Sequence, residues 1–163
     1  MLEDAKGKTG KPTEKRNKPE RPRDELGRPL PWGARNRLHL EDFDALSLER
    51  NHELGREHFK AGRFFPAHEA WETAWKQARG TDDAEFFKGL SQLGAGYVHL
   101  LRGNAHGAAR LLTRAAGRIG GYPPGHLGVD TPAVAATAER DAQAVRSGSL
   151  TPGPDAPVDP PPV

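Results

Sequence analysis

A histidine and a glutamate lie within the apolar stripe of one predicted helix. Residues 64–75 read Phe-Phe-Pro-Ala-His-Glu-Ala-Trp-Glu-Thr-Ala-Trp. At helical spacing one face collects Phe64, His68, Trp71, Glu72 and Trp75. Such a face packs inward, which predicts that two ionisable groups enter a core. Because burying a polar group without a partner costs roughly 2 to 7 kcal/mol, the two groups need partners or a use, and the stripe marks a candidate site.

Cysteine is absent from the chain. Its absence excludes disulfides, thiolate metal sites and cysteine nucleophiles, so a metal would need His, Asp or Glu as ligands. No stretch approaches the roughly 18 consecutive apolar residues of a membrane helix, and the charged N-terminal region has no apolar signal segment. These features predict a cytoplasmic protein that does not enter the membrane.

The net charge of +2 is unevenly distributed. Residues 1–37 have 11 Lys and Arg against 6 Asp and Glu, residues 38–146 have 13 against 14, and residues 147–163 have none against 2. The basic first segment is rich in Pro and Gly and poor in large apolar residues, so we predict a disordered arm. Six prolines in 147–163 predict a second disordered, solvated tail. One domain, 38–146, remains between them.

The basic arm has two interpretations. It is a solubilising tail of mixed charge, or it is an electrostatic arm that attracts nucleic acid or acidic partners. No aromatic residue accompanies the basic ones before Trp32, and aromatic side chains are what bases stack on. The sequence therefore favours the solubilising tail and predicts no nucleic-acid binding beyond weak contacts of the arm.

Helical periodicity runs through every long segment of the domain, and no segment alternates as a half-buried strand does. The predicted helices span about 47–60, 64–79, 81–101, 104–119 and 131–146. Thr81, Asn104 and Thr131 are the expected caps of the last three. The fold class is therefore all-α, a compact bundle of about five antiparallel helices with short connections and disordered tails.

Three glycines recur at seven-residue spacing in the predicted third helix: Gly89, Gly96 and Gly103. Glycine inside a helix costs roughly 1 kcal/mol relative to alanine. Three in one register predict that another helix or a ligand comes close to the backbone there.

Two motifs resemble those of a known family. Residues 59–75 follow the pattern Phe-x-x-Gly-x-Phe-Phe-x-Ala-His-Glu-x-Trp-Glu-x-x-Trp. Residues 89–93 read Gly-Leu-Ser-Gln-Leu, and 97–108 follow Tyr-x-His-x-x-x-Gly-Asn-x-x-Gly-Ala. In this order they resemble the domain-of-unknown-function family numbered 309, small helical proteins, over roughly 51–130. Lys60, in place of the usual asparagine, and Pro66, in place of an acidic or small residue, depart from the pattern. The resemblance implies an all-helical fold and brings no established activity.

The residues themselves allow a divalent-metal site. His68 and Glu72, one turn apart, could share one cation, with His99 as a third ligand and an open position for water. Glu69, rotated by about 100° from His68, would act as the base or orient a ligand. Without metal, His68 and the glutamates could form a general acid/base pair, with Gln92 orienting a substrate.

A structural interpretation competes with both. Glu72 could accept hydrogen bonds from His99 or from amides near Asn104, so that a polar network sets the register of the helices. Asn104 itself could cap a helix, or its segment could hold an anion at the free amides of the helix start. The cap accounts for the same residues more simply.

Two functions from different classes remain open at this point. The chain is a small hydrolase or other acid/base enzyme that uses His68, Glu69, Glu72 and His99 with a divalent metal. Alternatively, it is a non-catalytic helical interaction module in which the cluster is structural, although no 34-residue repeat supports this. Homodimerisation through an apolar helix face is allowed but nothing requires it, and neither substrate nor partner follows from the sequence.

Overall fold

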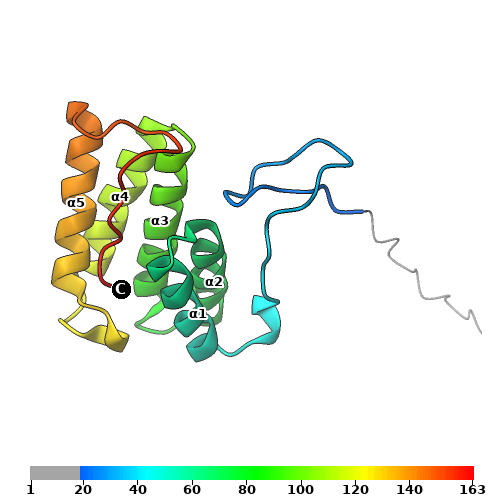
Figure 1. The fold of residues 1–163 in the computed structure, drawn as a ribbon. Coiled ribbons are helices and arrows are strands. Elements are labelled where there is room, and N and C mark those ends of the chain that lie inside the picture. Colours follow the sequence, from blue (N-terminus) through cyan, green and yellow to red (C-terminus); the bar gives the residue numbers. More distant parts are fainter. Residues whose placement is uncertain (1–18) are drawn as a thin grey trace, which may run out of the picture.

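The fold is a row of antiparallel helices, seen in a computed structural model that describes residues 19–163 (Figure 1). The helices are α1 (Leu48–Lys60), α2 (Phe64–Gln77), α3 (Ala84–Leu101), α4 (Ala105–Ile119) and α5 (Thr131–Ser147), with short 3₁₀ helices η1 (Phe43–Ala45) and η2 (His126–Gly128). Each helix packs against the next along the chain, so α3 lies between α2 and α4. Across 19–163 there is no strand, only one isolated bridge. The predicted all-α bundle is confirmed.

The helix starts follow local capping chemistry. Ser47 accepts a hydrogen bond from the Arg50 amide at 3.1 Å, and Asn104 accepts one from the Gly107 amide at 3.0 Å. Both satisfy amides that the first turn of a helix leaves unpaired. The N-cap predicted at Asn104 is therefore confirmed.

The caps predicted at Thr81 and Thr131 are wrong. Asp83 and Asp130 hold these N-cap positions. The Thr81 hydroxyl instead donates to the Ala78 carbonyl at 2.7 Å and closes the turn after α2. Thr131 is fully buried, and its hydroxyl donates to the carbonyl of Tyr122 at 3.0 Å. Both hydroxyls are therefore engaged outside the helix that follows, and Asp130 caps α5 by accepting from the Ala133 amide at 3.2 Å.

One hydrophobic core runs through the whole row of helices. Its large, fully buried side chains are Phe59, Trp71, Phe86, Phe87, Leu90, Leu93, Tyr97, Leu100, Leu112, Ile119, Val129 and Val134. The edge-to-face contact of Phe59 with Tyr97, at 5.8 Å between ring centroids, joins α1 to α3 across α2. None of the described helices has the length and apolar character needed to cross a bilayer.

Glycines set how closely the helices approach. A Cβ at Gly89 would lie 2.9 Å from Arg118 Cβ, and one at Gly96 would lie 2.8 Å from the Leu112 side chain. The close approach predicted there is thus made by α4. Gly103 has a different role. It adopts a φ of +83° in the turn after α3, a left-handed conformation that favours glycine, and no other group lies close to it.

The C-terminal segment 148–163 has no helix or strand, as predicted, but it is not a solvated tail. It crosses from the end of α5 and returns down the face of the bundle (Figure 1). The Gly153 amide donates to the Leu100 carbonyl at 2.9 Å. Val163 is buried in the core, and its carbonyl accepts a hydrogen bond from Arg56 Nε at 3.2 Å. Apolar residues among the prolines provide the burial that proline content alone does not reveal.

The predicted disordered arm also differs from the structure in its second half, while residues 1–18 lie outside the described part. Residues 20–40, here called the N-terminal loop, turn back on themselves and reach α2 with their tip (Figure 1). Leu26 packs against the core, and Arg102 donates to its carbonyl. Gly27, at φ +76°, lies against the Phe65 ring, where a Cβ would approach to 2.4 Å.

His52 is a buried histidine whose tautomer is determined by its neighbours. Trp71 Nε1 donates to its Nδ1 at 3.1 Å, so Nε2 carries the proton and donates to the Leu127 carbonyl at 2.9 Å. Only 8% of the residue is exposed. Burial lowers the pKa of His52 below its usual value near 6.5, because the interior disfavours the charged ring.

Stability is therefore expected to fall in mild acid. Below about pH 6.5 the unfolded chain binds a proton at His52 that the folded protein does not, so the free energy of unfolding falls as pH falls and is retained above that value. Urea midpoints measured between about pH 5 and 8 test this. His52→Gln keeps an acceptor and a donor but does not titrate, so its midpoint should change less with pH. Equal pH dependence of the two proteins would contradict the prediction.

Candidate functional site

Three ionisable side chains of α2 converge at the edge of the helix that faces α3. One ligating atom each of His68, Glu69 and Glu72 lies within 4.8 Å of the other two. Their arrangement is local in origin, because His68 and Glu69 lie at i,i+4 and i,i+3 spacing from Glu72, and positions so spaced are neighbours on a helix surface. The structure thus brings together the three residues predicted as a catalytic group.

The prediction that these groups enter the core is wrong. The His68 side chain is 24% exposed and that of Glu72 is 35% exposed. The buried face of α2 is centred instead on Phe64, Ala67, Trp71, Ala74 and Ala78. Since α2 is packed between α1 and α3, small alanines point into the helix contacts, and the polar pair lies at the margin of the buried face.

The orientation of His68 is set from α3. Its Nδ1 lies 2.9 Å from the Ser91 carbonyl oxygen and 3.0 Å from the Ser91 hydroxyl. Because a carbonyl only accepts, Nδ1 carries the proton in this contact. The other ring nitrogen, Nε2, lies 3.4 Å from Glu72 Oε2. In the neutral ring, the lone pair of Nε2 would therefore face a carboxylate oxygen of Glu72. This contact between His68 and Glu72 is favourable only when a proton or a cation lies between the two atoms.

Glu72 has a second cationic neighbour. Its Oε1 lies 3.7 Å from Lys76 Nζ, one turn further along α2. The Lys76 side chain is 55% exposed, and exposed pairs of this kind contribute little because water screens them. Lys76 can therefore turn away from Glu72 at small cost and leave that carboxylate free for another ligand.

Gly94 allows α3 to come this close to the cluster. A Cβ at this position would lie 3.0 Å from the His68 amide nitrogen and 3.1 Å from its Cα and Cβ. These neighbours are mostly backbone, so α2 itself would have to move. Gly94 lies outside the seven-residue spacing of Gly89, Gly96 and Gly103, so it was not predicted from the sequence. The signal that could have found it is that two glycines interrupt the otherwise apolar residues 93–98.

His99, predicted as a metal ligand, is not part of the three-residue cluster. Its Nδ1 lies 2.9 Å from Asn104 Nδ2, so the Asn104 amide donates to the ring while its oxygen caps α4. Burial lowers the pKa of His99, and the charge of Arg102 adds to this effect. The structure joins His99 to the start of α4 instead of to Glu72.

Gln92 and Asn104, predicted to bind a ligand, have partners within the protein. Gln92 Oε1 accepts a hydrogen bond from Arg118 Nη1 at 3.1 Å, and Arg118 Nε donates to Glu85 Oε2 at 2.9 Å. Gln92 thereby helps to join α3 to α4, while Asn104 caps α4. Neither residue borders the His68 cluster through these contacts.

Two hollows in the described structure lie elsewhere. The larger, of about 840 Å³, is lined by residues of the N-terminal loop, and a smaller one of about 370 Å³ lies between α4 and α5. His68, Glu69 and Glu72 line neither. The cluster belongs to neither hollow, and its partly exposed side chains are reached from the protein surface at the α2–α3 margin.

A second histidine cluster was not predicted as a site. His58 Nε2 lies 2.9 Å from Glu41 Oε1, and Arg63 Nε donates to His58 Nδ1 at 2.8 Å. With Nδ1 accepting, Nε2 carries the proton and donates to Glu41. Both lone-pair and proton positions of the ring are thus satisfied within the protein, and the group ties the segment before η1 to α1.

Among known proteins, the chain is similar to one family of unknown function. Residues 53–111 match the family model described as Domain of unknown function (DUF309). This range includes the His68 cluster and lies within the region in which the resemblance was expected. No curated protein and no solved structure matches the chain. From the middle of α1 to the middle of α4, the chain is therefore similar to the DUF309 family.

Proposed function

We propose that His68, Glu69 and Glu72 bind a divalent cation, and that the bound cation serves hydrolytic chemistry. The observation that carries the proposal is the orientation of His68. Ser91 holds its Nδ1–H, and Nε2 faces Glu72 Oε2 at 3.4 Å. A cation between this nitrogen and the carboxylates converts a repulsive contact into coordination.

The outer contacts of His68 support the proposal. Histidines that bind metals usually donate the second ring nitrogen to a carbonyl or carboxylate, which selects the tautomer and orients the ring. The Ser91 carbonyl does this here. One imidazole and two carboxylates suit zinc, manganese or ferrous iron, and three ligands leave positions open for water and substrate.

The open positions give the site its chemistry. A divalent cation lowers the pKa of bound water and polarises a carbonyl or phosphoryl oxygen. Because all three ligands come from two adjacent turns of α2, the cation would be open to solvent on the side away from α3. A water-accessible cation of this kind fits a hydrolase better than a closed structural metal site.

Metal content and affinity test the proposal. Tag-free protein purified without chelators should carry near-stoichiometric metal by plasma mass spectrometry, or bind zinc or manganese in calorimetry. His68→Ala and Glu72→Gln should each weaken binding by about 10- to 100-fold, the range measured when ligand support is lost. The matched control is His106→Ala, an exposed histidine on α4, which should bind as the wild type does. Wild-type protein that is metal-free and binds neither ion would contradict the proposal.

The alternative is a helical interaction module in which the cluster only positions α2 on α3. The paired contacts of His68 with the Ser91 carbonyl and hydroxyl favour it, because they join the two helices. In that case His68 is protonated and pairs with Glu72. Glu72→Gln would then lower the melting temperature by a few degrees with no change in metal content. Under the metal proposal the same change weakens cation binding while the apoprotein stays folded.

A further inference from the structure

We infer that the N-terminal loop, residues 20–40, binds single-stranded nucleic acid. The inference rests on four features of the loop: its contacts with the bundle, three arginines without a carboxylate partner in 19–163, an exposed tryptophan, and a hollow between its two runs. It is independent of the proposed metal site, because the loop shares no residue with the His68 cluster.

Hydrogen bonds within the N-terminal loop define its conformation. Asp24, which is buried, accepts hydrogen bonds from the amides of Leu26 and Arg28 at 3.0 and 2.8 Å. The Arg37 amide donates to the Arg23 carbonyl at 2.8 Å, and the Arg23 amide donates to Asn36 Oδ1 at 2.9 Å. These bonds hold the two runs of the loop together, and the contact of Leu26 with the core fixes them on the bundle.

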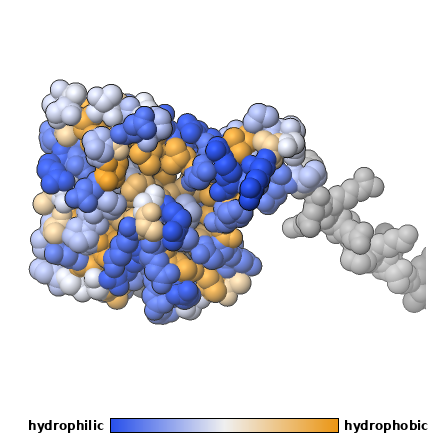
Figure 2. Space-filling view, in the orientation of Figure 1, coloured by the Kyte–Doolittle hydropathy of each residue, from blue (hydrophilic) through white to orange (hydrophobic). Residues whose placement is uncertain are grey.

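Three arginines of the loop are available to a ligand. Among the described residues, Arg28 is paired with Asp24 at 2.7 Å and Arg37 lies 3.5 Å from Glu25. Arg21, Arg23 and Arg35 are exposed, and no carboxylate in 19–163 pairs with them. Arg21 Nε donates to the Leu30 carbonyl at 2.7 Å, which leaves its two terminal nitrogens for a ligand. Hydrophilic side chains cover most of the loop where it projects from the bundle (Figure 2).

The charge distribution of the whole chain points to the same place. Residues 1–37 have five more basic than acidic residues, whereas the rest of the chain has three more acidic than basic ones. A polyanion is therefore attracted to the N-terminal side of the molecule and repelled weakly elsewhere. Residues 20–37 of the loop contribute two of these five surplus charges, with five arginines against three acidic residues, and residues 1–19 contribute the other three.

Trp32 supplies an exposed aromatic surface within the same loop, outside the lining of the hollow. It is 64% exposed, the largest exposed fraction among the described large apolar side chains. Exposed tryptophans next to arginines are the platforms on which unpaired bases stack, and each such stack contributes through a π-face that all bases share. The solubilising-tail interpretation of the arm leaves this exposure unexplained.

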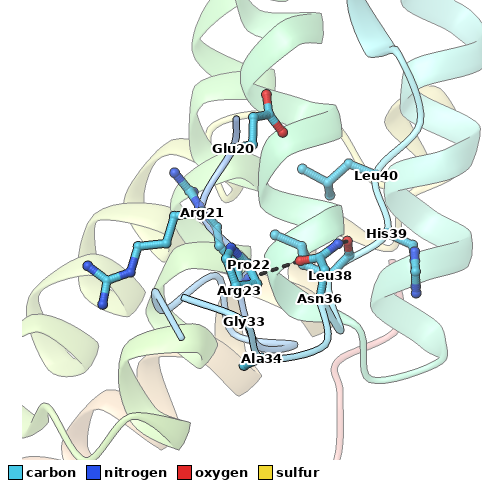
Figure 3. A pocket seen from close by; sticks show the side chains of 10 residues that line it. All are labelled: Glu20, Arg21, Pro22, Arg23, Gly33, Ala34, Asn36, Leu38, His39 and Leu40. Atoms are coloured by element: carbon cyan, nitrogen blue, oxygen red, sulfur yellow. Dashed lines mark hydrogen bonds between the residues drawn. The ribbon is translucent and has the colours of Figure 1, made fainter. Parts of the chain in front are cut away.

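The hollow gives an extended strand a place to lie. Residues 20–23 and 33–40 face each other around a space of about 840 Å³ (Figure 3), within the roughly 300 to 1,000 Å³ typical of ligand pockets. Leu40 points from one run toward the other, whereas His39 points away (Figure 3). Arg21 and Arg23 line the hollow with one carboxylate, Glu20. A concave surface with this surplus of positive charge fits a strand of phosphates and bases, whereas a bilayer is contacted by a convex apolar tip.

Fluorescence anisotropy with labelled single strands tests the inference. The probes are oligo(dT) and oligo(U) of about 16 nucleotides, a length that one site can cover, added to the full-length chain. Binding is expected to weaken as salt rises from about 50 to 200 mM. Removing three phosphate contacts with Arg21→Ala, Arg23→Ala and Arg35→Ala together should weaken it by at least about tenfold and reduce the salt slope by about 2.

The matched control removes three exposed arginines from the bundle. Arg79→Ala, Arg110→Ala and Arg114→Ala together change the net charge by the same amount. This control should keep its affinity for the oligonucleotides within about twofold of the wild type, because the phosphate contacts of the loop remain. The net charge falls equally in the two triple variants, so a difference between them reports on the loop itself. An equal loss in the two triple variants would overturn the assignment to the loop.

Trp32→Ala separates stacking from charge. It should weaken binding by about tenfold at every salt concentration, with an unchanged salt slope, because stacking releases no counterions. Its melting temperature should equal that of the wild type, since the side chain is exposed. Vesicles of phosphatidylcholine with phosphatidylserine provide the competing surface. Binding to vesicles without binding to oligonucleotides, or binding to neither, would overturn the inference.

Discussion

Trp71→Ala is expected to lower the free energy of unfolding by about 3 to 5 kcal/mol, the range measured when a large buried aromatic residue is truncated. Trp71 is fully buried and packs against Phe59 at 5.7 Å between ring centroids. Its indole also donates to His52 Nδ1 at 3.1 Å. Truncation therefore leaves a cavity between α1 and α2 and removes the donor that the His52 nitrogen uses.

Urea denaturation followed by circular dichroism measures this loss. Trp71→Phe keeps most of the volume but removes the donor, and should cost less than Trp71→Ala. The matched control is Trp75→Ala, one turn further along α2, where the ring is only partly buried and Lys88 Nζ lies 5.3 Å from its centroid. That change should cost about 1 kcal/mol. Similar losses for Trp71→Ala and Trp75→Ala would show that Trp71 does not hold the core in this way.

Gly94→Val should damage both the fold and the proposed metal site. A Cβ at this position would lie 3.0 to 3.1 Å from the backbone of His68, and valine adds two further carbons. The expected loss in the free energy of unfolding is up to about 3 kcal/mol, as for other overpacked interiors. Because α2 must move away from α3, His68 Nδ1 loses its contact with the Ser91 carbonyl, and divalent-cation affinity should fall at least about tenfold.

Gly96→Val is the matched control in the same helix. A Cβ at Gly96 meets the Leu112 side chain of α4 at 2.8 Å and does not approach α2. This variant should also lose stability, yet the folded fraction should retain wild-type cation affinity in calorimetry below its melting temperature. Equal cation affinity in the Gly94→Val variant and the wild type would contradict the positioning role of Gly94.

The order and type of the helices could be predicted because their signals are local. Apolar periodicity and the capping residue Asn104 act within a few residues of their own position. The same holds for His68, Glu69 and Glu72, since neighbouring positions on one helix come together wherever that helix packs. The error at Thr131 arose where the Tyr122 carbonyl, nine residues earlier, engaged the hydroxyl, and the error at Thr81 arose where the turn after α2 engaged it.

The two ends of the chain show the limit of composition as a guide. Proline and charge content predict a solvated coil, because they describe how little surface a segment can bury on average. Burial of Val163, and the seat of Leu26 against the bundle, depend on single apolar residues that meet a complementary surface. Such a surface exists only after the helices have assembled.

By itself, the sequence determined the all-α class, the five helices and the three clustered residues of α2, because helical geometry relates positions close in the chain. The tertiary structure alone decided that Ser91 orients His68, that Gly94 lets α3 approach, that His99 joins Asn104, and that 20–40 and 148–163 lie on the bundle. These contacts join residues far apart in the chain, and they are selected by how whole helices pack rather than by any local pattern.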